Sequence, residues 1–225
     1  MGRDPIGINE HYFDIRRRTE KEKRDFYYVF GAWYAAGSCT ESTYGRVDGS
    51  KGIYRNIKFQ SRNEKLVQIV KKQLKYKGDI EFHKSPEAKD RSSRWFRVHG
   101  VDTLCDRLDE LGAGVPKEER EFPKIPKKYL QDFIRGYFDA KLGIYQTKND
   151  TTLGMKANEK IITGLKDALK EYAHVEGGGN KTRFLRYGTK DVVKIYDFIY
   201  KEKGLHLPYK KKQMEMAHSR LKGVP

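Results

Sequence analysis

The chain has 225 residues, of which 37% are hydrophobic, 12% aromatic and 35% charged, and its formal net charge is +16. This balance excludes a disordered tail, which would contain few aromatic residues, and a membrane protein, which would contain far fewer charges. The positive charge favours nucleic acid as partner, because neutralising phosphates releases counterions, although a chain made basic for solubility alone is the alternative. Two cysteines and six scattered histidines predict neither a disulfide framework nor a zinc cluster.

Residues 1–25, "MGRDPIGINEHYFDIRRRTEKEKRD", form an expected basic N-terminal extension without the apolar core of a secretory signal. The longest apolar run, "YYVFGAWYAAG", has about half of the roughly 20 residues that a membrane-spanning helix needs. We therefore expect a monomer without membrane contact, located inside the cell in the cytoplasm or on the nucleoid, with an organelle left open. Heavy use of Lys, Glu and Tyr is typical of a thermophile.

The stretch "YVFGAWYAAGS" (28–38) has a counterpart in "FIRGYFDAKLG" (133–143). Gly31 matches Gly136 and Ala35 matches Ala140, so each copy places two small residues four positions apart on one helix face. Each copy alone fits an ordinary core helix. Because the copies stand in matching contexts, they predict two helices that pack closely on each other about a pseudo-twofold axis.

Similar elements follow each copy. Segments that read as strand, turn and strand come first, "SCTESTYGRVDGSKGIYRNIKFQ" and "IYQTKNDTTLGMK". Amphipathic helices over 61–75 and 156–170 come next, with Asn63 and Asn158 as N-caps. A second strand pair is expected in each half, "DIEFHK" with "SRWFRV" and "AHVEG" with "TRFLRYG", before a closing helix.

The sequence therefore predicts an α+β fold of two pseudo-symmetric αββαββα repeats, with the two glycine-containing helices packed at the central interface. We place the first repeat at 26–112 and the second at 130–225. The linker between them, 113–129, contains three prolines in "GAGVPKEEREFPKIPKKY", which indicates an extended and relatively stiff segment.

Alternation along the predicted strands indicates one polar, basic face. An antiparallel ribbon with such side chains can lie in a major groove, where Arg and Lys pair with guanine and Gln with adenine, while other residues contact phosphates. For any one residue, a solvated surface role is the alternative. The residues that we assign to DNA binding are Arg46, Lys51, Arg55, Lys58, Gln60, Lys84, Arg94 and Arg97, then Gln146, Lys148, Lys156, Lys181, Arg183 and Arg186.

From about Phe26 onward, the chain resembles the LAGLIDADG homing endonucleases in their single-chain, two-repeat form. The most specific matches are "FPKIPKKYLQDFIRGYFDA", which resembles the linker and second motif, and "LHLPYKKKQ", which resembles the basic segment after the last repeat helix. The resemblance implies two saddle-shaped antiparallel sheets astride a long, nearly asymmetric duplex DNA site. It also implies that an acidic residue at the foot of each motif helix binds a divalent cation such as Mg²⁺. Each of these sites then hydrolyses one DNA strand.

This chain departs from the family at those acidic positions. Counting from the motif glycines, the first acid position is Ala36 and the second is Lys141, or Leu142 if Gly143 is the second motif glycine. None of these side chains binds Mg²⁺, which prefers oxygen ligands. Asp139 lies about 200° around the helix from Lys141, which predicts a structural role. The sequence thus predicts an inactive or impaired endonuclease scaffold, and whether this chain binds the ion is left open.

The resemblance also implies that Lys117 and Lys210 or Lys211 lie near the scissile phosphates. Lys141 could take over part of a metal ion's charge by contacting a phosphate. Engineering, natural decay and the use of other carboxylates all remain open as reasons for the missing acids. Some intron-encoded members of the family assist folding of their host intron, so an RNA splicing helper is one alternative function, although the sequence contains neither an aromatic RNP pair nor a KH-type loop. A non-cleaving DNA-binding protein is another alternative.

Overall fold

The computed structural model describes residues 7–9, 11–16, 18–45, 47–84, 92–148, 150–179 and 183–221. Two halves follow each other in the chain, and the α+β class that the sequence predicts is confirmed. The first half contains α1 (Glu20–Ala36), β1 (Gly37–Gly45), β2 (Lys51–Ser61), α2 (Glu64–Gln73), β3 (Glu81–Lys84), β4 (Ser92–His99) and α3 (Asp102–Glu110).

Within the described residues, the second half repeats this order with one strand fewer and one helix more. A short 3-10 turn (Lys127–Tyr129) leads into α4 (Leu130–Lys141), β5 (Gly143–Gln146), β6 (Thr151–Lys156), α5 (Glu159–Ala173), β7 (Phe184–Tyr187), α6 (Thr189–Ile199) and α7 (Pro208–Leu221). The strand predicted at "AHVEG" is wrong, because residues 174–179 form no strand. Gly178 and Gly179, which follow this stretch, have positive φ angles, and such a backbone does not continue an extended strand.

The first motif helix begins earlier than the expected repeat boundary at residue 26. Thr19 caps it, since its hydroxyl accepts from the Glu22 backbone N–H and the Glu22 carboxylate accepts from the Thr19 N–H at 2.8 Å. This reciprocal pair is a capping box. Part of the N-terminal extension also belongs to the core, because Tyr12 and Phe13 are buried against Phe26.

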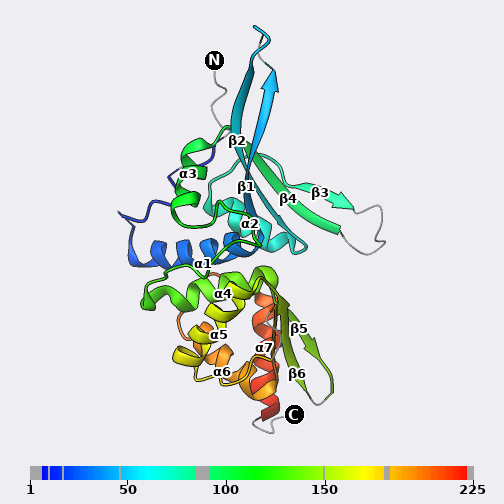
Figure 1. Ribbon diagram of the computed structural model, residues 1–225. Helices are drawn as coiled ribbons and strands as arrows, with labels where there is room; N and C mark the ends of the chain where they lie inside the picture. Colours follow the sequence, from blue (N-terminus) through cyan, green and yellow to red (C-terminus); the bar gives the residue numbers. More distant parts are fainter. Residues whose placement is uncertain are drawn as a thin grey trace.

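Helices α1 and α4 pack against each other between the two halves (Figure 1). A Cβ atom on Gly31 would collide with the carbonyl oxygen of Phe133, and one on Gly136 would collide with that of Tyr28. These collisions are with backbone atoms, so only glycine allows the helices this close together. The central interface that the paired small residues predict is therefore present, with Ala35 buried and Ala140 half-buried.

Two antiparallel sheets extend from this helix pair. The first has the strand order β1-β2-β4-β3 and the second the order β5-β6-β7. In the first sheet, Phe59 pairs with Phe96 on the face that α2 and α3 cover, whereas Lys58 pairs with Arg97 on the other face. Each sheet thus has one face in the core and one open face.

Asn63 and Asn158 cap α2 and α5 as the sequence predicts. Their side-chain oxygens accept hydrogen bonds from Leu66 N at 3.1 Å and Ile161 N at 2.9 Å. Both helices bury their apolar stripes under the sheets, which leaves the other sheet faces free. Among the described helices, none combines the length and apolar character needed to span a membrane.

Candidate nucleic-acid interface

The open face of the first sheet carries basic and aromatic side chains in fixed mutual positions. Strand register places Lys58 and Gln60 of β2 beside Arg97 and Trp95 of β4. The Lys58 ammonium lies 4.8 Å from the centre of the Trp95 ring, and the Arg97 guanidinium lies 5.5 Å from it. Gln60 Nε2 donates to Ser93 Oγ at 2.7 Å. These contacts hold the polar groups in place and so reduce the entropy lost when a ligand binds.

A second hydrogen-bonded group continues this face toward the β1–β2 hairpin. Thr40 Oγ1 donates to Asn56 Oδ1 at 2.8 Å, and Asn56 Nδ2 donates to Ser42 Oγ at 3.0 Å. Asn56 is buried, although it lies on the open side of the sheet. The face is therefore polar along the length of β2.

The open face of the second sheet is smaller and combines charge with aromatic surface. Alternation from the buried residues of β6 and β7 places Lys156 and Arg186 on this face, and both are exposed. Gly154 lies between the rings of Tyr145 and Phe184, since a Cβ atom there would be 3.3 Å from Phe184 and 3.4 Å from Tyr145. Because Gly154 has no side chain, the rings of Tyr145 and Phe184 can lie over the open face at this position.

A hollow of about 840 Å³ lies where the two sheets meet the ends of α1 and α4, and we call it the central groove. Its walls come from Gln60 and Ser93 of the first sheet and from Lys156 and Phe184 of the second. Its floor contains the last residues of the two motif helices, Ala36 and Lys141, together with Lys117 of the linker. Sequence reasoning named each of these three floor positions, and the structure brings them together.

Basic side chains of the described residues occur on both sides of the sheets. On the helix-covered side, Arg55 pairs with Asp106 and Asp109, and Arg94 with Glu64, whereas an exposed lysine such as Lys65 of α2 has no ion pair within the described ranges. Those of the groove and the open sheet faces have no carboxylate partner at ion-pair distance within the described ranges. They include Lys58, Arg97, Lys117, Lys141, Lys156, Arg183 and Arg186. A polyanion bound in the groove would therefore meet several positive charges that no carboxylate of the described residues neutralises.

Three residues that the sequence assigns to DNA binding lie on the helix-covered side instead. Arg55 and Arg94 share the parity of the buried residues of their strands and make the ion pairs described above. Gln146 is turned toward α7, where its Nε2 donates to the Gln213 carbonyl at 2.9 Å. The assignment counted polar residues along a segment without fixing which alternate set faces the core. These three residues are not part of the interface proposed below.

The other assigned residues lie at the margins. Lys51, Lys84 and Lys148 are exposed at strand ends or in a turn. Arg183 directly precedes β7 and lines a hollow next to the groove with Lys117, Lys141 and Lys156. The remaining two assignments, Arg46 and Lys181, lie outside the described residues.

Arg120 of the linker caps the end of α1, a role that the sequence analysis missed. Its side chain is buried, with 2% of its surface exposed, and it donates to the carbonyl oxygens of Tyr34 at 2.5 Å and Gly37 at 3.1 Å. It also donates to the Ala113 carbonyl at 2.7 Å. An Arg in a basic linker carries no sequence signal that separates such a cap from a surface charge.

Lys210 caps the end of α4 in the same way. Lys210 lies in the first turn of α7, and its buried ammonium donates to the carbonyl oxygens of Phe138 at 2.8 Å, Asp139 at 2.9 Å and Leu142 at 2.7 Å. When Gly31 is aligned with Gly136, two of these carbonyls, those of Asp139 and Leu142, match the Tyr34 and Gly37 carbonyls bound by Arg120. All three of its N–H groups are used, so Lys210 has none left to donate to a phosphate. Lys211 is turned elsewhere, 5.5 Å from the Tyr200 ring.

Asp139 has the structural role that its helix position predicts. Only 3% of its surface is exposed, and its Oδ2 accepts from Tyr28 Oη and from Leu207 N, both at 2.7 Å. It therefore links α4 to α1 and to the segment before α7. Burial raises the pKa of the Asp139 carboxyl from 3.8 to about 6, since the nearby donors and the Lys210 charge only partly offset desolvation.

We expect Asp139→Asn to change the pH dependence of stability. Because the folded-state pKa is raised, the native protein holds a proton that the unfolded chain has released, and this contribution is lost as pH rises toward 6. Between about pH 4 and about pH 7, the unfolding free energy of the wild type should fall relative to the variant by up to about 3 kcal/mol. Urea denaturation across this range measures the difference. The exposed Asp167→Asn serves as control, and parallel curves for all three proteins would contradict the assignment.

These residues do not fit a divalent cation at the ends of the motif helices. The two equivalent positions hold Ala36 and Lys141, and Asp139, the one carboxylate among the described residues that line the groove, already accepts from Tyr28 and Leu207. Among the residues that the structure describes, no group of three or more His, Cys, Asp or Glu side chains is arranged to hold a metal ion. Buried cations instead occupy the neighbourhood of both helix ends.

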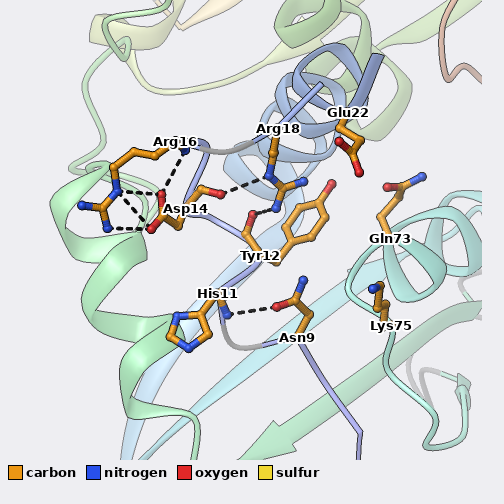
Figure 2. A pocket seen from close by; sticks show the side chains of 9 residues that line it. All are labelled: Asn9, His11, Tyr12, Asp14, Arg16, Arg18, Glu22, Gln73 and Lys75. Carbon is orange, nitrogen blue, oxygen red and sulfur yellow. Dashed lines mark hydrogen bonds and ion pairs between the residues drawn. The ribbon is translucent and has the colours of Figure 1, made fainter. Parts of the chain in front are cut away.

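A separate hollow of about 720 Å³ lies between the N-terminal segment and the end of α2 (Figure 2). Three of its charged groups, Asp14, Arg16 and Arg18, are bound within the segment itself. Asp14 pairs with Arg16 at 2.6 Å, and Arg18 donates to the carbonyl of Asp14 at 3.1 Å. This hollow shares no residue with the central groove, and its lining mixes both signs of charge, with Arg16, Arg18 and Lys75 beside Asp14 and Glu22.

No protein-family model matches the sequence, and no curated relative is similar to it in sequence. The fold is nevertheless that of the LAGLIDADG homing endonucleases. I-GzeII, solved in complex with its DNA target, is 12% identical with a TM-score of 0.58 over 88% of this chain and 91% of that chain. I-LtrWI, bound to target DNA, is 10% identical with a TM-score of 0.58 over 96% and 92%.

I-SmaMI, solved on an uncleaved DNA target with calcium ions, gives a similar match, at 11% identity and a TM-score of 0.57 over 88% and 92% of the two chains. Because each match spans most of both chains, the two halves described here have counterparts within one chain of those proteins. The resemblance read from the paired motifs is thus confirmed for the fold.

Proposed function

We propose that this protein binds duplex DNA across the open faces of its two sheets and does not cleave it. The observation that carries the proposal is the set of basic side chains that line the central groove and the open sheet faces, such as Arg97, Lys117 and Lys156, without a carboxylate partner within the described ranges. A folded protein leaves positive charges concentrated and unpaired where a polyanion can supply the missing partners.

The shape of this surface suits a long duplex. The two sheets, one at either end of the central groove, can each follow a major groove of the DNA, and a side chain such as Gln60 can then read base edges. The remaining lysines and arginines contact phosphates, which contribute affinity more than specificity. The structures of I-GzeII and I-LtrWI on their DNA targets show that this fold accommodates such a ligand.

The absence of cleavage is proposed from the helix ends. Hydrolysis by a bound Mg²⁺ would need carboxylate ligands beside the DNA phosphates. Ala36 offers no side-chain ligand, and Lys141 carries a positive charge that repels a cation. We therefore assign no hydrolytic step to these residues, and the scaffold acts as a binding protein.

A selection from a randomised duplex library in EDTA, followed by affinity measurements across a range of salt concentrations, tests the binding. Arg97→Ala and Arg186→Ala should each weaken binding severalfold and reduce the salt dependence by about one phosphate contact. Lys65→Ala, which removes an exposed charge from α2 behind the first sheet, is the matched control and should bind as the wild type does.

Competition with structured RNA separates the proposal from an RNA splicing role. We expect the selected duplex to bind much more tightly than RNA of equal length. A preference for RNA would contradict the proposal, as would equal weakening by Arg97→Ala and Lys65→Ala.

A further inference from the structure

Two ammonium groups lie together at the centre of the groove. Lys141 is the last residue of α4, and Lys117 Nζ donates to the carbonyl oxygen of Ala36, the last residue of α1, at 3.2 Å. Since Ala36 and Lys141 occupy equivalent positions in the two motif copies, the lysines lie at the paired ends of the two central helices. Both line the central groove and the adjoining hollow.

The surroundings of Lys117 leave this positive charge uncompensated. Desolvation by the groove walls, together with the charges of Arg120, Lys141 and Lys58, lowers the pKa of Lys117 from 10.5 to about 8, while Glu118 opposes them. An anion placed between Lys117 and Lys141 would remove this repulsion. The repulsion between these cations therefore favours binding of a negatively charged ligand at this site.

Helix C-termini usually repel anions, because their free carbonyl groups carry partial negative charge. Here that charge is neutralised on both helices. Arg120 binds the carbonyls of Tyr34 and Gly37 on α1, and Lys210 binds three carbonyls at the end of α4. The buried caps thus convert the two helix ends into a floor that tolerates an anion, with the two lysines above it.

We propose that Lys117 and Lys141 jointly bind one backbone phosphate at the midpoint of the DNA site, with no metal ion between protein and phosphate. This inference rests on the proposed duplex binding and extends it. An ammonium has three donors, of which Lys117 uses one on Ala36, so the two lysines have donors left for phosphate oxygens. The groove, at about 840 Å³, admits a DNA backbone segment between the two sheets.

The test uses the duplex selected in EDTA, with the phosphates along its centre replaced one at a time by uncharged methylphosphonates. One central replacement should weaken wild-type binding about tenfold, because it removes charge-assisted hydrogen bonds to both lysines. In the Lys117→Met, Lys141→Met double variant the same replacement should change affinity less than about twofold. Lys65→Met is the control, and Lys117→Arg should retain the wild-type response because it retains the charge.

The outcomes separate the two proposals. If the wild type binds no duplex, the proposed function fails. If it binds, but the central replacement weakens binding of the wild type and of the double variant equally, the lysine-bound phosphate is excluded. It is also excluded if the single variants Lys117→Met and Lys141→Met lose their response at two different phosphates. Circular dichroism checks folding of each variant, and Lys141→Met alone, at an exposed side chain, provides the comparison if the double variant unfolds.

Discussion

Replacing Gly31 with alanine should destabilise the protein by about 3 kcal/mol, the upper part of the range for overpacked cores. The added Cβ would collide with the Phe133 carbonyl oxygen, and backbone cannot move aside as a flexible side chain can. The helices α1 and α4 must therefore separate, which opens the aromatic core around Phe30 and Phe133. Gly136→Ala should act similarly through the Tyr28 carbonyl.

Urea denaturation of both single variants and of the double variant measures this effect. Once one alanine has separated the helices, the second should cost less, so the double variant should be more stable than the sum of the single effects implies. Gly45→Ala is the control, because no atom lies within 4 Å of a Cβ built there. Wild-type midpoints for both single variants would show that the helices do not pack as closely as described.

Arg120→Met should have an effect of similar size, about 3 kcal/mol or more, although it changes no residue of the helix interface. The guanidinium satisfies the carbonyls of Tyr34, Gly37 and Ala113, and its loss leaves buried acceptors without donors. Methionine fills much of the same volume, so the change mainly reports the lost hydrogen bonds.

Arg55→Met is the matched control for this variant. Arg55 pairs with Asp106 and Asp109, whose carboxylates are largely exposed, so its loss should cost only about 1 kcal/mol or less. Thermal and urea denaturation of the two variants give the comparison. Equal destabilisation would show that the Arg120 contacts are no stronger than a surface ion pair.

The central architecture could be predicted because its signals are local. Gly31 and Gly136 recur with the same neighbours, and a helix pair in close contact requires such small residues. Asn63 and Asn158 likewise cap helices through hydrogen bonds within three residues, which a sequence pattern captures. The same locality explains why Asp139 could be assigned a structural role from its helix position alone.

The remaining site features depend on tertiary geometry. The side of the sheet on which Arg55 lies depends on the register of β2, and one residue of slip reverses the assignment. The cap formed by Arg120 depends on how the linker folds back over α1, for which the sequence offers no periodic signal. The segment "AHVEG" (173–177) was predicted to form a strand, but Gly178 and Gly179, which follow it, have positive φ angles that do not continue an extended edge.

Cleavage of the selected duplex by the wild type, with Mg²⁺ or Mn²⁺, separates binding from hydrolysis. The wild type is run beside its Ala36→Asp, Lys141→Asp double variant, which restores a carboxylate at the end of each motif helix. We predict that the wild type binds the duplex and leaves both strands intact, whereas the double variant nicks or cuts it only when the metal is present. Metal-dependent cutting by the wild type would contradict this account and would mean that other carboxylates hold the ions.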